Sequence, residues 1–279
     1  MASDPALVEQ VADKSLVRAS FGRAARGYDE WAVMQRRIGD RLLGCLSAAP
    51  LPHRPKILDL GSGTGYCTRQ LQQRQASVTG LDIAPQMLVT ARSRQLVDTA
   101  YVCADAEYLP VADDSIDLVF SNLMIQWCRD LQRLFGEVAR VLKPGGLLVF
   151  STFGPETLSE LRAAWRQVDM HSHVNHFAAE SEIKKAMLRA GLINESLECE
   201  ATRVTYGGVL ELMRELKGIG AHNVTRDRPR TLTGKEKIRR VIDGYPSRQV
   251  EGEITATFEL ILGKCSRPAA DRERIEWRG

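Results

Sequence analysis

The sequence predicts a doubly wound α/β fold built on a mostly parallel, seven-stranded sheet. Short runs rich in β-branched and aromatic residues alternate with helical segments between residues 57 and 153, and this alternation is typical of parallel strands joined by helical crossovers. Two later β-rich runs, at 198–206 and 253–262, could complete the sheet as an antiparallel pair. A composition of 44% hydrophobic and 26% charged residues is that of a globular chain, not of a disordered or fibrous one.

The predicted elements follow one another in a regular order. Apolar side chains recur at helical spacing in the first fifty residues, as at Ile38, Leu42 and Leu46, and predict N-terminal helices. Strands are expected at 57–60, 78–81, 100–103, 116–121 and 147–153, with helices near 65–74, 85–94 and 130–141. Further helices are expected at 156–168, 180–190 and 209–217.

These elements divide the chain into three parts. Residues 1–50 are expected to form a helical lid, and residues 51–266 a main domain with a substrate- or partner-binding insertion at about 154–250. Within that insertion, residues 218–250 contain no predicted element, and connections of this length are usually functional or mobile. The polar residues 267–279 are expected to form a flexible tail.

Composition also narrows the class of protein. No run of eighteen apolar residues is present, so no membrane-spanning helix is expected, and the first residues lack the pattern of a secretory leader. Six cysteines are scattered without a CxxC pair, which argues against a disulfide framework or a zinc site. His171, His173 and His176 have no recognisable metal-binding spacing, and loop histidines are the favoured interpretation. A cytoplasmic protein without a metal site is therefore expected.

The net charge of the chain is only +3, but one stretch of the sequence is strongly basic. Residues 217–240 hold eight basic and two acidic side chains, a local charge of +6. The stretch is either a solvated surface or a docking patch for an acidic partner, because a field of this kind speeds encounter. It contains no aromatic side chain on which a base could stack, so a nucleic acid is not the expected partner.

The clearest motif is a buried strand that runs into a glycine turn. The strand at 57–60 leads into the run GSGTG at 61–65 and then into a helix, and glycines allow a sharp turn against which a ligand can lie. Asp82 ends the second strand and Asp105 follows the third. Carboxylates at these strand ends suit an adenosine ligand, Asp82 on the ribose and Asp105 on the adenine amino group. A plain turn with solvated aspartates is the simpler alternative.

The same motif discriminates among adenosine cofactors. A dinucleotide fingerprint requires Gly or Ala at the sixth position of GxGxxG, and that position is Tyr66 here. The run from Asp59 to Gly65 instead reads DxGxGxG. It resembles the first motif of the class I methyltransferases, a Rossmann-like family that uses S-adenosylmethionine. The resemblance covers about 50–155 and 195–263, and it implies this cofactor with S-adenosylhomocysteine as its product.

Carried over position by position, the resemblance implies a set of cofactor-binding residues. Gly61 and Gly63 would face the methionine moiety, with Ser62 between them, and Asp82 would hold the ribose. Ile83 and Met87 would flank the adenine, and Asp105 with the Ala106 amide would read its edge. Asn122 would border the reaction centre.

Several segments lie outside this shared fold, and the most specific is LKGIGA at 216–221. The others are Phe21–Ala25, Tyr28-Asp29, Gln35-Arg36, Ser121–Leu123, Gln126–Cys128, Ala164-Trp165, Val168-Asp169, Asn175 and Phe177. Together they are similar to one family, the malonyl-acyl-carrier-protein O-methyltransferases of biotin synthesis. One departure is Ser62, where many members would have Cys.

This resemblance implies methylation of the free carboxylate of a malonyl thioester on acyl carrier protein, in biotin (pimeloyl) biosynthesis. A carboxyl group has an ordinary pKa near 4, so it is already a nucleophile at neutral pH and needs no general base. The protein has to exclude water and align the reacting atoms. Acyl carrier proteins are strongly acidic, which suits the basic stretch at 217–240.

A cation is expected to hold the substrate carboxylate. Arg214 and Lys217 lie three residues apart on one predicted helix, so they are expected to share a face, and both residue types suit carboxylates. Arg23 is a further candidate. Tyr28 is expected to donate to the carboxylate or to pack on the cofactor. The alternatives are solvated helix charges and a core aromatic residue.

Three other functions share some of these motifs. A small-molecule carboxyl methyltransferase would need the same cofactor site but would have no use for the basic stretch. A methyltransferase-like assembly factor of respiratory complex I resembles the same family. A cofactor-bound regulatory module without turnover is the third alternative.

Overall fold

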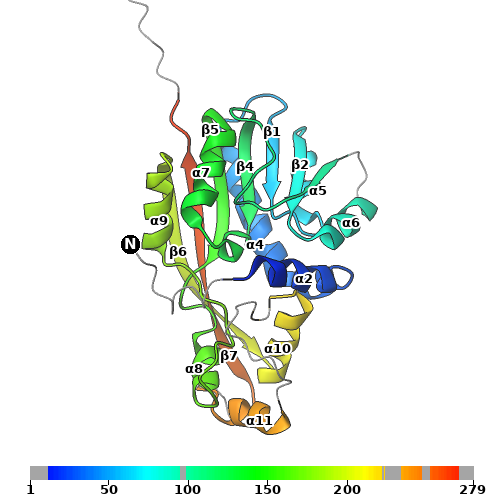
Figure 1. Cartoon of the computed structure of the whole chain (residues 1–279), viewed down its shortest axis with the longest axis vertical. Helices are drawn as coiled ribbons and strands as arrows, with labels where there is room; N and C mark the ends of the chain where they lie inside the picture. Colours follow the sequence, from blue (N-terminus) through cyan, green and yellow to red (C-terminus); the bar gives the residue numbers. More distant parts are fainter. Residues whose placement is uncertain (1–11, 95–98, 222, 224–233, 247–251, 270–279) are drawn as a thin grey trace, which may run out of the picture.

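The computed structural model describes residues 12–94, 99–221, 223, 234–246 and 252–269 (Figure 1). Its centre is one seven-stranded sheet with the strand order β3-β2-β1-β4-β5-β7-β6. The strands are β1 Lys56–Leu60, β2 Ser77–Asp82, β3 Ala100–Cys103, β4 Ile116–Asn122, β5 Leu142–Phe153, β6 Ile193–Tyr206 and β7 Ile254–Ser266. The first five are parallel, and β7 runs antiparallel between β5 and β6. The predicted sheet and its antiparallel closing pair are confirmed.

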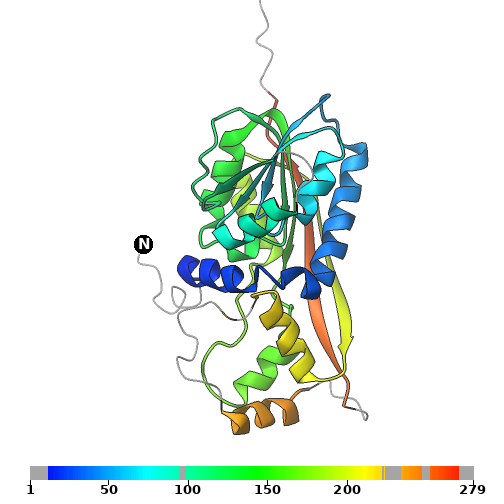
Figure 2. The same ribbon diagram turned by 90° about the vertical axis from the view of Figure 1, so that its right-hand side faces the viewer.

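Helices cover both faces of this sheet. The described helices are α2 Lys14–Ala24, α3 Tyr28–Trp31, α4 Val33–Gly44, η1 Cys45–Ala48, α5 Tyr66–Gln72, α6 Pro85–Ser93, η2 Ile125–Trp127, α7 Leu131–Val141, α8 Ser159–Arg166, α9 Glu180–Arg189, α10 Val209–Gly218 and α11 Lys235–Asp243. Because side chains alternate along a strand, Phe120 packs in the core on the α4 and α5 side, while Val119 packs with α7 and α9. Figure 2 shows α4 and α7 on opposite sides of the sheet.

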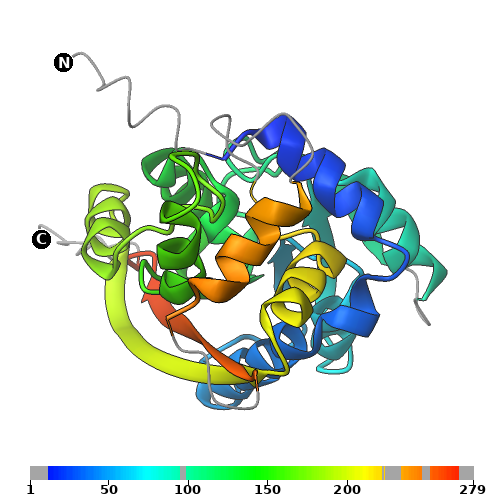
Figure 3. The same ribbon diagram turned by 90° about the horizontal axis from the view of Figure 1, so that it is seen from below.

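The last two strands are longer than the rest and carry a second layer of structure. Residues 260–266 of β7 pair with β5, whereas residues 254–259 pair only with β6. This extension continues past the carboxyl ends of the parallel strands, where α8, α10 and α11 gather around it (Figures 1 and 3). Helix α11 was not predicted, and β6 begins at Ile193, five residues before the expected strand.

The N-terminal helices lie between the sheet and this second layer. Helix α2 packs against α6, and α3 packs against α10. Asp13 caps α2 by accepting a hydrogen bond from the Ser15 amide at 2.9 Å. The Ser20 hydroxyl donates to the Gly220 carbonyl at 2.9 Å, so α2 is also bound to the end of α10. These helices therefore close over the edge of the sheet where the sequence predicts the ligand.

The predicted tail begins at a residue that is still paired with the sheet. Arg267, where the predicted tail begins, still exchanges backbone hydrogen bonds with β5, its amide donating to Gly146 at 2.9 Å and its carbonyl accepting from Gly145 at 3.0 Å. Residues 270–279 lie outside the described residues. In the part of the chain that the structure describes, no helix has the length and apolar character needed to span a membrane.

Candidate active site

The glycine turn after β1 has the backbone conformation that only glycine adopts readily. Gly61, Gly63 and Gly65 have φ angles of 80°, 54° and 79°. A side chain at Gly61 would also clash with Met124. The amides of Gly61 and Ser62 both donate to the Leu81 carbonyl, at 2.8 and 2.9 Å, which binds the turn to the end of β2. The turn is therefore shaped both by its glycines and by the neighbouring strand.

Asp82 connects the end of β2 to this turn. One carboxylate oxygen accepts from the Gly63 amide at 3.0 Å, and the other accepts from the Ala84 amide at 2.8 Å. Burial raises the pKa of Asp82 to about 6, although these two hydrogen bonds oppose the rise. Asp82 is consequently ionised at neutral pH, with oxygen atoms available at the edge of a pocket.

Asp105 lies after β3 beside a residue that the sequence did not indicate. Lys14 of α2 forms ion pairs with Asp105 at 2.7 Å and with Glu107 at 2.8 Å. The Glu107 carboxylate, which is 7% exposed, also accepts from the Arg129 amide at 2.6 Å. The sequence showed Lys14 only as one charge in a predicted helix, because its partners are about ninety residues away.

These groups line one small pocket of about 80 Å³ at the carboxyl edge of the sheet. Its lining includes Tyr28 and the predicted cofactor residues Gly61, Gly63, Asp82, Ile83, Met87, Asp105, Ala106 and Asn122. Ser62 is absent from this lining and borders a neighbouring pocket of about 50 Å³. The Ser62 hydroxyl is buried without a hydrogen-bond partner, close to Gly80 of β2.

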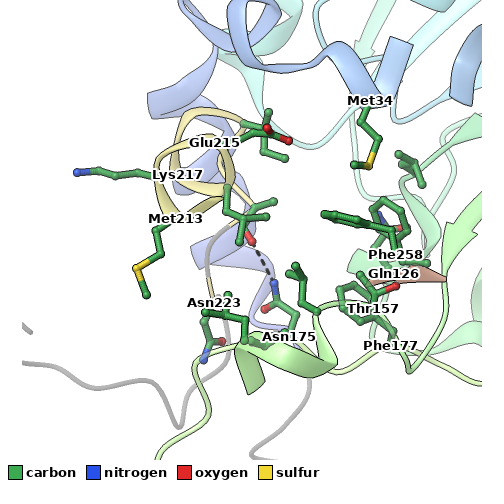
Figure 4. Close-up of a pocket in the computed structure, with 18 of the residues that line it drawn as sticks. Met34, Gln126, Thr157, Asn175, Phe177, Met213, Glu215, Lys217, Asn223 and Phe258 are labelled. Atoms are coloured by element: carbon green, nitrogen blue, oxygen red, sulfur yellow. Dashed lines mark hydrogen bonds between the residues drawn. The ribbon is translucent and has the colours of Figure 1, made fainter. Parts of the chain in front are cut away.

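A second, much larger cavity of about 630 Å³ adjoins this pocket. Phe21, Tyr28, Leu123 and Trp127 line both spaces, so the two meet. The far wall is mostly apolar, with Phe177 and Phe258 on one side and Met213 on the other (Figure 4). Polar side chains that line it include Gln126, Thr157, Asn175 and Asn223.

Tyr28 lies where the spaces join. It lines the large cavity, the small pocket and the neighbouring pocket beside the glycine turn. Burial raises the pKa of the Tyr28 hydroxyl, and the negative charges of Asp82 and Asp29 raise it further. The hydroxyl therefore keeps its proton at neutral pH and remains a hydrogen-bond donor.

The structure separates the two cations that were expected to share a helix face. Lys217 borders the large cavity, but its side chain is exposed and points away from the other lining residues (Figure 4). Arg214 lines a different depression, with Trp31 and Glu211. Both side chains are exposed, and they line different depressions although they lie three residues apart on α10, so the structure does not bring them together around one cavity. Arg23 is exposed and lines neither the cavity nor the small pocket.

One of the loop histidines does belong to the cavity wall. The His173 ring stacks on Trp165 with a centroid separation of 3.6 Å, and its Nε2 lies 2.8 Å from Asp169. Lys237 of α11 donates to the other oxygen of Asp169 at 2.8 Å. Burial alone would raise the pKa of Asp169, but the bonds from Lys237 and His173 lower it to about 2. Helix α11 is thus attached to the wall through an ionised carboxylate.

The remaining histidines do not form a metal centre with it. Among the described residues, no group of three or more His, Cys, Asp or Glu side chains is arranged to hold a metal ion. Burial lowers the pKa of His173, which makes the neutral ring the prevailing form at neutral pH. His173, stacked on Trp165 and paired with Asp169, is therefore part of the cavity wall.

Comparison with known proteins agrees with this geometry. A family model described as a methyltransferase domain matches residues 58–150, the segment that contains the glycine turn, Asp82 and Asp105. The crystal structure of the YcgJ protein from Bacillus subtilis has a TM-score of 0.62 and covers 82% of this chain and 98% of its own, at 17% identity. A likeness at this identity supports the fold alone.

Curated relatives match over almost the whole length. The malonyl-[acyl-carrier protein] O-methyltransferase of Methylovorus sp. (strain MP688) is 45% identical over 268 residues, covering 92% of this chain and 90% of that protein. The enzyme of the same name from Halorhodospira halophila is 44% identical, covering 91% and 88%. The biotin biosynthesis bifunctional protein BioHC of Cellvibrio japonicus is 41% identical, and the match spans 51% of its length. Because these matches span about nine tenths of both proteins, the chain belongs to the malonyl-[acyl-carrier protein] O-methyltransferase family.

Proposed function

We propose that this protein transfers a methyl group from S-adenosylmethionine to the free carboxylate of malonyl-acyl carrier protein, in biotin biosynthesis. The observation that carries the proposal is the junction of the small polar pocket with the large apolar cavity at Tyr28. A methyl donor in the first space and a thioester in the second would meet there. The names of the relatives support the choice of substrate.

The residues around the small pocket have the chemistry that the cofactor needs. The turn leaves open space where a side chain at Gly63 would be, and the Asp82 carboxylate offers acceptors for two ribose hydroxyls. Ile83 and Met87 supply apolar surface for the adenine. When bound, S-adenosylmethionine supplies an activated methyl group on a positively charged sulfur. Asp105 and the Ala106 amide would read the adenine edge, and Asn122 would border the reaction centre.

The chemistry requires positioning more than proton transfer. The malonyl carboxylate is ionised at neutral pH, so no residue has to remove a proton from it. Tyr28, which stays protonated, can donate to that carboxylate or to the cofactor and fix its orientation. Phe21, Leu123 and Trp127 exclude water around the junction, which strengthens electrostatic interactions within it.

The partner would approach across the second layer. Ile238 of α11 lines the large cavity, so this helix stands beside a route by which a pantetheine arm could enter. Lys235 and Arg239 on the same helix are exposed. Their charge is opposite to that of an acyl carrier protein. Arg226, Arg228 and Arg230, which belong to the same predicted basic patch, lie outside the described residues.

A methyl-transfer assay tests the proposal directly. The protein is incubated with S-adenosylmethionine labelled in its methyl group and with malonyl-acyl carrier protein, malonyl-coenzyme A or free malonate. We expect labelled methyl ester on the malonyl thioesters and much less on malonate. Efficient methylation of free acids with no preference for a thioester would favour the small-molecule alternative, and binding of the cofactor without turnover on any acid would favour a regulatory module.

A further inference from the structure

We propose that the side-chain amide of Gln35 binds the carboxylate that accepts the methyl group, an assignment that rests on the proposed malonyl thioester substrate. Gln35 lies in the first turn of α4 and lines the large cavity. It also lines the pocket beside the glycine turn, together with Ser62 and Asn122. Among the described residues, Tyr28 and Gln35 alone are common to both linings. Gly61, Gly63 and Asn122 line both this pocket and the small pocket, so Gln35 lies next to the space that the acceptor oxygen has to reach for an in-line transfer.

The side-chain oxygen of Gln35 has no hydrogen-bond partner among the described residues. This Oε1 atom is buried. Buried polar groups normally have partners, so an unpaired side-chain oxygen at a ligand junction indicates a group that a ligand satisfies. Half a turn about the last side-chain bond exchanges the oxygen and the nitrogen, so the amide can present two N–H donors to a carboxylate.

The backbone of Gln35 is held firmly while its side chain is free to bind. The Asn122 amide nitrogen donates to the Gln35 carbonyl at 2.9 Å. The Asn122 oxygen in turn accepts from the Ser151 hydroxyl at 2.8 Å. This chain of bonds attaches the start of α4 to strands β4 and β5. The position from which the Gln35 side chain extends is thereby fixed relative to the sheet.

The charges around the cavity favour a neutral donor over a cation. The described lining of the large cavity contains one lysine, Lys217, one glutamate, Glu215, and no arginine, and Arg36 of the adjoining pocket donates to the Asp29 carbonyl. Lys217 is exposed and directed away from the cavity (Figure 4), and His173 is engaged with Asp169. A fixed cation beside the reacting atoms would also repel the positive sulfur of the cofactor. The amide of Gln35 and the hydroxyl of Tyr28 can hold a carboxylate without that repulsion.

Two substitutions at this position test the assignment. Gln35→Met keeps the length of the side chain but removes its donors, and Gln35→Glu places a second carboxylate opposite the first. We expect Gln35→Met to lower kcat/KM for malonyl-acyl carrier protein by about 10- to 100-fold, the range for losing hydrogen bonds to a charged group. Calorimetry should show a similar loss in the binding of malonyl-pantetheine to the protein saturated with S-adenosylhomocysteine. Gln35→Glu should be impaired further, and part of its activity should return as the pH is lowered.

The cofactor provides the internal control. Both variants should bind S-adenosylhomocysteine with an affinity within about threefold of the wild type, and Gln73→Met, the same exchange at an exposed position just after α5, should behave as wild type. Weaker cofactor binding with an unchanged KM for the thioester would overturn the proposal and assign the amide to the cofactor. Wild-type kinetics in Gln35→Met would also overturn it. Failure of the wild-type protein to methylate any malonyl thioester would instead contradict the proposed function itself.

Discussion

Asp59, in β1 just before the glycine turn, is a buried carboxyl group whose ionisation destabilises the folded state. Its side chain is 1% exposed, and one oxygen accepts from the Thr68 hydroxyl at 2.5 Å. Burial raises the pKa of Asp59 to about 7; the charge of Asp82 adds to the rise, and the Thr68 bond opposes it. Because the pKa is higher in the folded chain than in the unfolded one, this group favours folding below about pH 4, and that contribution is lost as the pH rises through about 7.

Asp59→Asn isolates this effect. The amide has the same shape, can still accept from Thr68 and never carries a charge. We expect the free energy of unfolding of the variant, relative to wild type, to increase by about 2–3 kcal/mol between pH 5 and pH 8. Urea unfolding of both proteins at the two pH values measures this difference. A constant difference across the range would show that Asp59 does not titrate there.

The raised pKa of Asp82 should make cofactor binding depend on pH. Its pKa is about 6 in the free protein, and only the ionised carboxylate offers acceptors to both ribose hydroxyls. The affinity for S-adenosylhomocysteine should therefore decrease as the pH falls from 7.5 to 5.5. Asp82→Ala should weaken binding at pH 7.5 by at least about tenfold, as expected for loss of a charged hydrogen bond, and should flatten the pH dependence. Calorimetry that gave equal affinities for variant and wild type would remove the ribose assignment.

At the scale of elements, the LKGIGA segment packs against the N-terminal helices α2 and α3. Gly218 packs directly on the Trp31 ring of α3, and Gly220, with a φ angle of 72°, lies against the backbone of Ser20. The side chains of Leu216, Ile219 and Ala221 line the large cavity. The same six residues thus set the position of α2 and α3 and form part of the cavity wall.

Gly218→Ala should disturb this contact. The added methyl group would overlap the Trp31 ring, so α10 and α3 must separate, and we expect a loss of about 1–3 kcal/mol in unfolding free energy. Hydrogen exchange should increase first in residues 28–31. Gly44→Ala is the matched control, because the structure places nothing within 4 Å of a side chain there, and it should be neutral or stabilising by up to about 1 kcal/mol. Equal effects of the two substitutions would contradict the packing role.

The elements also show why some sequence predictions succeeded and others did not. The strands and the glycine turn could be predicted because short runs rich in β-branched and aromatic residues and the DxGxGxG motif are local patterns. Helix α11 escaped prediction because its apolar side chains, Ile238, Val241 and Ile242, stand among charges. The positions of Arg214 and Lys217 depend on which side of α10 packs against Trp31, and residue spacing along a helix does not contain that information.

At the scale of the whole molecule, the candidate site is assembled from parts that are remote in sequence. The sheet contributes the cofactor side, as the motif predicted, and the second layer contributes the wall of the large cavity. Lys14 and Gln35 come from the N-terminal helices, whose placement over the sheet is a tertiary property. Gln35 belongs to a segment that carries the family resemblance, but no local pattern assigned a role to either residue. Ser62 was expected among the cofactor residues from its place in the turn, but the hydroxyl is turned toward β2.

The basic residues of α11 fall into two groups, those that form hydrogen bonds to other described residues and those that do not. Lys237 donates to Asp169, and the Arg240 side chain donates to the Gln167 carbonyl at 3.1 Å, so both hold the helix on α8. Lys235 and Arg239 lie four residues apart on the exposed side, where they form no ion pair with a described residue. If α11 receives an acidic carrier protein, Lys235 and Arg239 should act on association, and the hydrogen-bonded Lys237 and Arg240 on stability.

Two double variants test this division. Lys235→Glu with Arg239→Glu should lower kcat/KM for malonyl-acyl carrier protein by about tenfold at low salt and leave malonyl-pantetheine, which has no carrier, almost unaffected. The difference should shrink as salt rises, because exposed charges are screened within about 8–10 Å at physiological ionic strength. Lys237→Met with Arg240→Met should lower the melting temperature and impair both substrates alike, since it loosens α11 from the cavity wall. Equal losses on both substrates in the first variant, or no salt dependence, would mean that α11 is a solvated surface and that the carrier docks elsewhere.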